Sequence, residues 1–183
     1  MKAFVPNDYP TIGVEQEFHL IDPQTAELSS GIDQVIEHLN PEAREFICYE
    51  LYLSVCEQKS PVCRTADELQ QHIAQGRRVL AQACSKAGVR LAAAGSHPFS
   101  NWRDQRVVPS DHYQWVTENC VYLAQRMLAF GLHVHVGMRS APGAMYVMHE
   151  LRRWAYPLMA LSANSPFFEG HSTGLASTRT HIF

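Results

Sequence analysis

The stretch Gly13-Val14-Glu15-Gln16-Glu17-Phe18-His19-Leu20 alternates between side chains of different character. Successive side chains of an extended chain point to opposite faces, so the large apolar residues share one face whereas Glu15 and Glu17 share the other. The pattern predicts a β-strand over residues 11–21, which the turn sequence Asp22-Pro23-Gln24-Thr25 ends. One face of this strand would be buried, and the other would carry acidic groups.

The two carboxylates of this strand indicate a cation site. Glu15 and Glu17 lie two residues apart, about 7 Å along a strand, and they repel one another unless a cation lies between them. A divalent metal ion is the natural partner. The alternative is an exposed sheet face, where alternating acidic residues are common.

A second strand, predicted over 132–138, has the same arrangement with histidines. His133 and His135 share one face, and Leu132, Val134 and Val136 form the other. Two imidazoles on one face are a common way to hold a metal ion or an anionic ligand, and a structural pair that is satisfied by hydrogen bonds is the alternative.

Two further acidic residues, Glu50 and Glu57, lie in or next to a third predicted strand over 46–56, in a stretch that Pro61 ends. Their apolar neighbours predict that both carboxylates are partly buried, and a buried carboxylate needs a cation or hydrogen-bond donors. A separation of seven residues puts them on opposite faces of a regular strand. Both therefore reach one site only if this strand is bulged or irregular.

Helical periodicity accounts for much of the remaining chain. A short helix is predicted over 32–39, and Thr65-Ala66-Asp67-Glu68 is a capping box that starts a helix ending at Gly88. A buried strand is predicted over 89–95 and a loop over 96–109. The next predicted helix ends at Gly131 and carries one apolar stripe, made of Tyr113, Val116, Cys120, Leu123 and Met127.

The last predicted helix starts at Pro142, which suits a first helical turn, and is kinked or ended by Pro157. Its inward face is predicted to be Met145, Met148, Leu151 and Ala155. Strands and helices mix without a strict βαβ rhythm, and the strands with a clear pattern are apolar on one face only. These features favour an α+β class with an antiparallel sheet.

Composition narrows the classes of function. The chain has 183 residues and a formal net charge of -3, and its Lys and Arg residues are scattered, so we expect no nucleic-acid partner. No apolar run approaches the roughly 18 residues that span a bilayer, and the first residues form no signal-peptide core, so we expect a cytoplasmic protein without a membrane partner. The five cysteines contain no C-x-x-C pair and are expected to be reduced core thiols.

Five blocks of the chain, taken in order, are similar to those of the type-2 glutamate–cysteine ligase family, a group of carboxylate–amine ligases. The resemblance spans nearly the whole chain, and the fourth and fifth blocks are together the most specific. The blocks are Gly13-Val14-Glu15-Gln16-Glu17-Phe18-His19-Leu20, Glu57-Gln58-Lys59-Ser60-Pro61-Val62-Cys63, Gly95-Ser96-His97-Pro98-Phe99, Gly131-Leu132-His133-Val134-His135-Val136-Gly137, and Leu161 to Phe167 running on to Ser177-Thr178-Arg179-Thr180-His181-Ile182-Phe183.

The resemblance implies a glutamine synthetase-like fold, in which an antiparallel sheet forms the floor of an active-site funnel and helices pack on the other face. It implies metal ligation by Glu15, Glu17, Glu57 and His133, with Glu50 as a further acidic ligand. Arg179 would contact phosphate or the substrate carboxylate, and His135 would position substrate or bind metal. The cofactors would be ATP with Mg²⁺ or Mn²⁺, because carboxylate-rich ligation favours these ions over zinc.

The activity that the resemblance implies is transfer of the ATP γ-phosphate to a carboxylate, most simply the side chain of glutamate, followed by attack of an amine such as that of cysteine. Family members are about twice as long, so residues 1–183 are expected to be a single catalytic domain equal to the N-terminal half of a longer enzyme domain. Such a half would form homo-oligomers or pair with the C-terminal half. Gln58-Lys59-Ser60 is more polar than the corresponding family segment.

Two other functions stay open at the level of sequence. A metal-dependent hydrolase would use His133 and His135 with Glu15 or Glu17 around an activated water, without ATP. A non-catalytic, ligase-like module would bind metal or nucleotide, or serve only in assembly. Binding of zinc, iron or manganese without ATP would favour the hydrolase, and failure to bind nucleotide at all would favour the module over the ligase.

Overall fold

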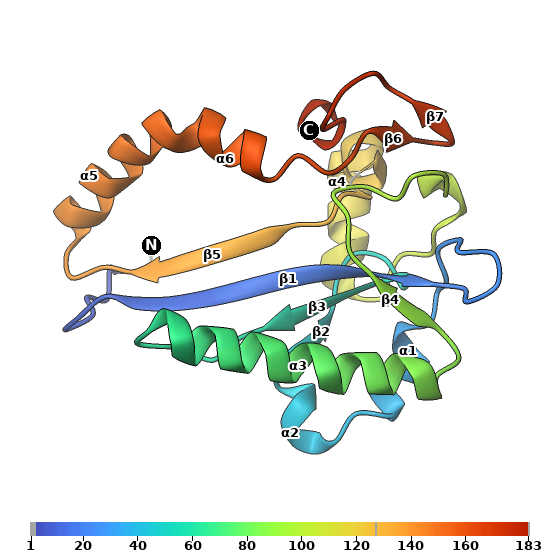
Figure 1. Cartoon of the computed structure of the whole chain (residues 1–183), viewed down its shortest axis with the longest axis horizontal. Coiled ribbons are helices and arrows are strands. Elements are labelled where there is room, and N and C mark those ends of the chain that lie inside the picture. The colour runs from blue at the N-terminus through green and yellow to red at the C-terminus, as the bar shows by residue number, and fades with distance from the viewer. Residues whose placement is uncertain (1–2, 127, 183) are drawn as a thin grey trace.

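The computed structural model describes residues 3–126 and 128–182, with the backbone alone for residues 121–125. Its centre is a five-stranded antiparallel sheet in the order β2-β3-β1-β4, in which β5 also pairs with β1 (Figure 1). The antiparallel sheet and the α+β class are therefore confirmed. The strands are β1 (Thr11–Ile21), β2 (Ile47–Tyr49), β3 (Val55–Lys59), β4 (Arg90–Ala92) and β5 (Leu132–Gly137).

Strand β1 is the axis of the sheet and has the bounds predicted from its alternating pattern. One edge pairs with β3, and the other pairs with β5 in its first half and with β4 at its end. Its buried face carries Val14, Phe18 and Leu20, together with Gln16, whose side-chain oxygen accepts a 2.8 Å hydrogen bond from Arg77 Nε. Burial of this face fixes the register, because a slip by one residue would bury Glu15 and Glu17 instead.

Helices cover this apolar face. Helix α3 (Ala66–Lys86) runs along the sheet, and Leu80, Ala83 and Cys84 pack with residues of α1 (Ile32–Glu37) and of the sheet in the main core. The predicted N-terminal cap of α3 is confirmed, because Thr65 Oγ1 accepts a hydrogen bond from the Glu68 amide at 3.1 Å. Gly88, with a φ of 75°, ends the helix in the left-handed conformation that glycine adopts without strain. A four-residue helix, α2 (Pro41–Arg44), precedes β2.

The predicted strand over 46–56 is wrong as a single element. The chain forms β2, leaves the extended conformation at residues 50–54, and returns antiparallel as β3. The irregular segment is held by long-range contacts that local pattern does not reveal: the Leu53 amide donates to Arg106 O, and the Leu20 amide donates to Ser54 O. β3 ends at Lys59, shortly before Pro61.

Two other elements differ from prediction in their bounds. β4 covers only three residues, which are half-buried or exposed, so the predicted buried strand over 89–95 is wrong in length and burial. Helix α4 (Asp111–Arg126) ends well before Gly131. On its predicted stripe Tyr113 and Val116 are half-buried and Cys120 is exposed, whereas the side chains of Leu123 and Met127 lie outside the described residues. The predicted loop over 96–109 is confirmed, and it holds the 3-10 turn η1 (Trp102–Asp104) and two isolated bridge residues, Ser96 and Val107.

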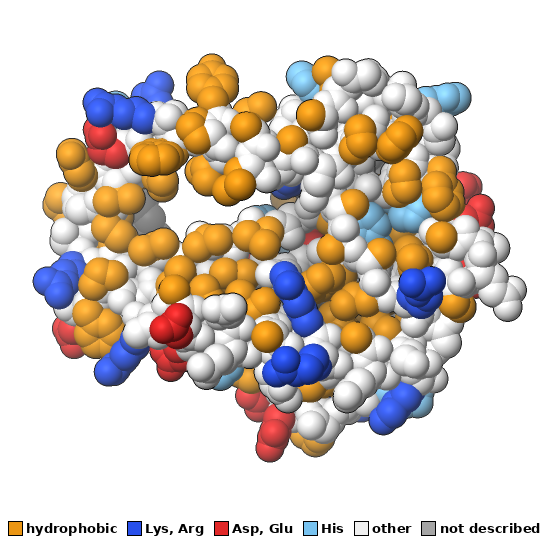
Figure 2. Space-filling model, viewed as in Figure 1, with side chains coloured by type: hydrophobic (Ala, Val, Ile, Leu, Met, Phe, Trp, Pro, Cys, Tyr) orange, Lys and Arg blue, Asp and Glu red, His pale blue; other side chains and the backbone are white. Residues whose placement is uncertain are grey.

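The predicted inward face of the last helix is exposed. Met145, Met148 and Leu151 are 60%, 58% and 52% accessible to solvent, and Ala155 is also exposed. The helix breaks into α5 (Ala141–Leu151), the 3-10 turn η2 (Arg152–Trp154) and α6 (Ala155–Leu161). The break precedes Pro157 because a proline ring clashes with the carbonyl four residues earlier, here in Arg153. Figure 2 shows a hollow, lined by apolar side chains, between this segment and β5.

The last described residues form a small hairpin, β6 (Phe167–Phe168) with β7 (His171–Ser172), and the 3-10 turn η3 (Arg179–His181). All five cysteines are free, and Cys56, Cys63 and Cys84 are buried, whereas Cys48 is half-buried and Cys120 is exposed. None of the helices in the described part of the chain has the length and apolar character that crossing a membrane requires.

Candidate functional site

The strand register gathers the predicted site residues on the face of the sheet that α3 does not cover. Glu15 on β1 lies directly between Lys59 on β3 and His133 on β5. Glu17, two residues along β1, pairs with Glu57 on β3. Side chains of directly paired residues point to the same face, so five ionisable groups meet there.

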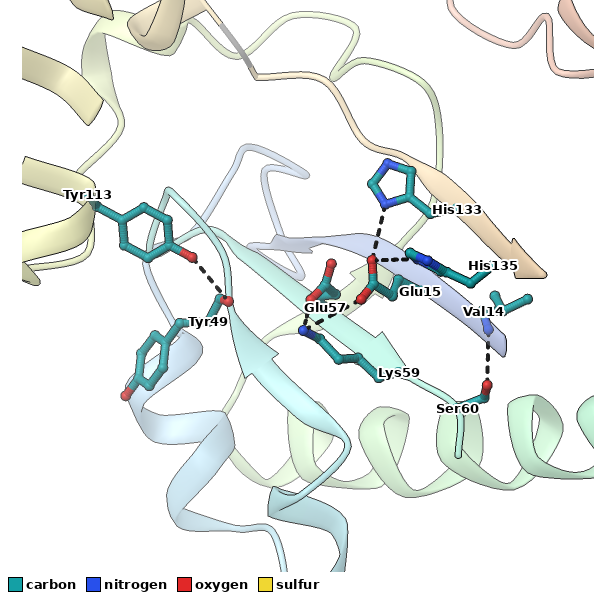
Figure 3. Close-up of polar contacts among 9 residues, drawn as sticks. All are labelled: Val14, Glu15, Tyr49, Glu57, Lys59, Ser60, Tyr113, His133 and His135. Atoms are coloured by element: carbon teal, nitrogen blue, oxygen red, sulfur yellow. Dashed lines mark hydrogen bonds and ion pairs between the residues drawn. The ribbon is translucent and has the colours of Figure 1, made fainter. Parts of the chain in front are cut away.

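The carboxylate of Glu15 is the centre of this group (Figure 3). Its Oε2 atom lies 3.1 Å from His135 Nε2 and 3.4 Å from His133 Nδ1, and its Oε1 atom lies 3.6 Å from Lys59 Nζ. Burial opposes ionisation of Glu15, but the bond from His135 and the charge of Lys59 outweigh it and hold the pKa below the ordinary value.

Three predicted ligands converge as a metal site requires. One ligand atom each from Glu15, Glu57 and His133 lies within 4.8 Å of the other two. Two carboxylates and one imidazole form an oxygen-rich donor set that suits Mg²⁺ or Mn²⁺. The residues present therefore fit a divalent cation.

Glu17 lies on the same face of the sheet and forms a hydrogen bond with the backbone at the start of β5. Its Oε2 atom accepts a 2.7 Å hydrogen bond from the Gly131 amide, which fixes the carboxylate below the start of β5. Burial raises its pKa, and the Gly131 amide only partly offsets this effect. Glu17 thus lies next to the converging trio and faces a pocket.

This pocket has a volume of about 200 Å³ and adjoins the metal-ligand group through His133. Two buried polar atoms in its lining have no hydrogen-bond partner among the described residues: Oε2 of Glu50 and Nε of Arg179. Buried polar atoms are rarely left unpaired, so both are available to a ligand or ion. The remaining lining residues are Glu17, Leu51, Tyr52, Val55, Ala129 and Gly131.

Glu50 reaches this pocket because the chain leaves the extended conformation between β2 and β3, whereas Glu57 belongs to the converging trio and is not among the lining residues. Burial, followed by the charges of Glu17 and Glu57, raises the pKa of Glu50 to about 7. Glu50 lines the pocket but is not one of the three residues whose ligand atoms converge.

Arg179 and His135 take different places. Arg179 comes from the 3-10 turn η3, where its amide donates to Ser165 Oγ at 3.1 Å, and its side chain lines the pocket. His135 binds Glu15 but lies outside both the converging trio and the pocket lining, and its side chain is largely exposed.

Sequence reasoning did not assign Lys59 or the Gly131 amide to the site. Lys59 Nζ lies 3.0 Å from Glu57 Oε1, and this bond raises the pKa of the ammonium. The period of two along a strand puts Lys59 on the same face as Glu57, so the signal was present in the sequence. The Gly131 amide carries no such signal, since any residue has a backbone N–H.

The fold is that of the glutamate–cysteine ligase class of α+β domains. The chain is similar to a bifunctional glutathione synthetase from Pasteurella multocida, with a TM-score of 0.62 and 12% identity over 87% of this chain and 24% of that one. It is also similar to a glutamate–cysteine ligase from Francisella tularensis in complex with AMP, with a TM-score of 0.52 and 11% identity over 79% of this chain and 29% of that one.

Residues 11–183 match the model of glutamate–cysteine ligase family 2, and the chain belongs to that family. Two relatives named "Putative glutamate–cysteine ligase 2" illustrate the match. The protein from Herpetosiphon aurantiacus is 39% identical over 94% of this chain and 45% of its own length. The protein from Thermobifida fusca is 36% identical over 98% of this chain and 46% of its own length. The chain thus spans about half the length of these relatives.

Proposed function

We propose that this chain supplies the metal-binding part of an ATP-dependent carboxylate–amine ligase. The observation that carries the proposal is the convergence of Glu15, Glu57 and His133 within 4.8 Å, beside a pocket where Glu50 and Arg179 have unpaired buried atoms. This combination offers sites for cations and for an anionic group within one concave surface. Membership of the family and the names of the relatives support the same reaction class.

The chemistry requires that two anions, ATP and a carboxylate, approach one another. Bound Mg²⁺ or Mn²⁺ neutralises phosphate charge, and Glu15, Glu57 and His133, with Glu17 and Glu50 beside them, would hold such ions. Arg179 would orient a phosphate or substrate carboxylate with its guanidinium, whose geometry suits both groups. His135 would hold Glu15 in place through their 3.1 Å contact.

The substrates proposed are ATP, glutamate and an amine such as that of cysteine. Transfer of the γ-phosphate to the glutamate side chain breaks the bond to ADP and forms an acyl phosphate, and the amine then displaces phosphate to form an amide. The proposed compartment is the cytoplasm, which supplies ATP and keeps thiols such as the five free cysteines reduced.

We propose that the whole enzyme requires more polypeptide than this chain and that a segment equal to the second half of the relatives' length completes it. The relatives are about twice as long. Apolar side chains of β5, α5 and α6 are exposed around the hollow of Figure 2, where such a segment would bury them.

Calorimetric titration of the chain with ATP tests the proposed function. We expect binding in Mn²⁺ or Mg²⁺ and none in EDTA, because clustered carboxylates repel the phosphates when no cation is bound. Equal affinity in EDTA would exclude a metal bridge. Tight Zn²⁺ binding without any nucleotide affinity would favour the hydrolase, and absence of nucleotide binding under all conditions would favour a non-catalytic module.

A further inference from the structure

Lys59 is a cation within the proposed metal site. It projects from β3 directly opposite Glu15, and its ammonium lies 3.0 Å from Glu57 Oε1 and 3.6 Å from Glu15 Oε1 (Figure 3). These are the same two carboxylates that converge with His133. Among the described residues, no other lysine or arginine forms an ion pair with either of them.

The ammonium and a divalent ion compete for the same two carboxylates. A magnesium ion lies about 2.0–2.1 Å from each oxygen ligand, and Mn²⁺ takes similar oxygen-rich sites. A divalent ion at this distance would repel an ammonium that stayed within 3.0–3.6 Å of the same carboxylates. Both cations therefore cannot keep their contacts with Glu15 and Glu57 at once.

The lysine side chain can leave without disruption of the fold. It is 41% accessible to solvent, so an open path leads away from the sheet. The backbone of Lys59 stays fixed, because its amide donates to Phe46 O at 2.7 Å. Rotation of the side chain alone would free both carboxylates.

We propose that Lys59 is a resident counterion that a divalent metal must displace, and that it sets the metal concentration at which the site fills. The proposal rests on the proposed metal site. In the metal-free chain the ammonium balances Glu15 and Glu57, and in the metal-bound chain it faces solvent. Lys59 acts on metal affinity without being a ligand.

Calorimetric titration of the 183-residue chain with Mn²⁺ tests this competition. Lys59→Met should bind Mn²⁺ about three- to thirtyfold more tightly than the unmodified chain, since two partly exposed ion pairs no longer oppose the metal. Lys59→Arg keeps the charge and should bind as the unmodified chain does. Lys86→Met removes the same charge from an exposed position at the end of α3 and should leave the affinity unchanged.

Thermal unfolding gives a second readout. In EDTA, Lys59→Met should melt at a lower temperature than Lys86→Met, because the charges of Glu15 and Glu57 then lack their counterion. Mn²⁺ should raise the melting temperature of Lys59→Met by more than it raises that of Lys86→Met. Equal or weaker Mn²⁺ affinity of Lys59→Met would overturn the role of Lys59 alone. Absence of Mn²⁺ binding to every variant would overturn the metal site itself, and with it this inference.

Discussion

At the scale of single residues, the site is a balance of like and unlike charges around Glu15. Its carboxylate contacts His133, His135 and Lys59, whereas Glu17, Glu50 and Glu57 add negative charge from the same face. The raised pKa of Glu50 records this excess of negative charge, after the larger effect of burial. A bound divalent ion would balance this negative charge, and removal of one carboxylate should weaken the binding of that ion.

Glu57→Gln should weaken Mn²⁺ binding by at least about tenfold, because it removes a charged ligand while it keeps the shape of the side chain. In the complete enzyme the same change should slow ADP release by about a hundredfold. Calorimetry and an ADP-release assay measure the two effects, with Glu118→Gln on the exposed face of α4 as the matched control. Unchanged Mn²⁺ affinity with an unchanged circular dichroism spectrum would make Glu57 a structural carboxylate.

Two buried histidines should make part of the free energy of unfolding depend on pH. Burial lowers the pKa of His19 to about 4 and also lowers the pKa of His97. Both rings donate to backbone carbonyls through Nε2, His19 to Ala94 at 3.3 Å and His97 to Ala26 at 3.0 Å, and His97 Nδ1 accepts from the Ser100 amide. The folded chain therefore binds fewer protons on these two rings than the unfolded chain, which protonates them as the pH falls below their ordinary pKa near 6.5.

The two histidines should therefore contribute a fall in stability as the pH drops from 7.5 to 5.5, by roughly 1 kcal/mol for His19 alone. Glu50, whose pKa is raised to about 7 in the folded chain, contributes a change of the opposite sign over this range, so the histidine part is isolated by comparing variants that all keep Glu50. His97→Asn keeps an acceptor for Ser100 but cannot titrate, so the histidine part of its pH dependence should be smaller. Urea unfolding at both pH values measures the difference. The exposed His72→Asn should keep the full dependence, and a His97→Asn slope equal to that of His72→Asn would contradict the role of His97.

The residues of the site were predictable from sequence to the extent that strand alternation controls them. Glu15, Glu17 and His133 share a face because each lies in a regular strand whose other face differs in character. The relation of Glu50 to Glu57 depends on the irregular chain at 50–54, which long-range hydrogen bonds hold. Periodicity alone therefore left open whether these two carboxylates meet.

At the scale of elements, helix α3 meets the sheet through a close contact at Gly76. A Cβ atom at this position would overlap the Gln58 side-chain amide, with 2.7 Å to its Cδ atom. Gln58 is buried on β3, and its Nε2 donates to Ile73 O in α3 at 3.2 Å. The pair therefore sets how closely α3 approaches β3.

Gly76→Ala should destabilise the chain by about 1–3 kcal/mol through overpacking, although alanine favours a helix over glycine by about 1 kcal/mol. In the double variant Gln58→Ala/Gly76→Ala the overlap is absent, so its cost should be smaller than the sum of the two single changes by about 0.5–3 kcal/mol. Urea unfolding of the four proteins measures this coupling. Additive effects, or a more stable Gly76→Ala, would show that the contact does not limit the approach.

Elements were predictable where each finds its packing partner within this chain. Strand β1 and helix α3 bury each other's apolar faces, so pattern and structure agree at their bounds. Helix α5 has the apolar stripe of an inward face, but Met145, Met148 and Leu151 are exposed. A periodic pattern reports that a face is suited to burial, and it does not say which polypeptide provides the cover.

At the scale of the whole molecule, exposed apolar side chains gather around the hollow between β5 and α6 (Figure 2). Strand β5 pairs only with β1 in the described part of the chain, so its other edge is open. Open edges and large apolar patches favour association with further polypeptide. We use the name β5–α6 surface for eight exposed apolar residues of β5, α5 and α6: Leu132, Val134, Val136, Met145, Met148, Leu151, Leu158 and Leu161.

The β5–α6 surface should be covered by further polypeptide in the complete enzyme. We expect the 183-residue chain alone to self-associate and to show no ligase turnover, because correct alignment of ATP, metal and acceptor supplies several kcal/mol of the rate enhancement. Co-expression with the second half of the Herpetosiphon aurantiacus relative should give a defined heterodimer that releases ADP with glutamate and an amine. Sedimentation and an ADP-release assay measure both outcomes.

Variants of the surface make this test specific. Val134→Thr with Leu161→Ser makes two exposed positions more polar, so it should reduce self-association and also weaken capture of the second half. Val62→Thr changes an exposed apolar residue outside this surface and should alter neither. A monomeric 183-residue chain that turns over glutamate and ATP unaided would contradict the prediction, because the site would then be complete without any cover on β5 and α6.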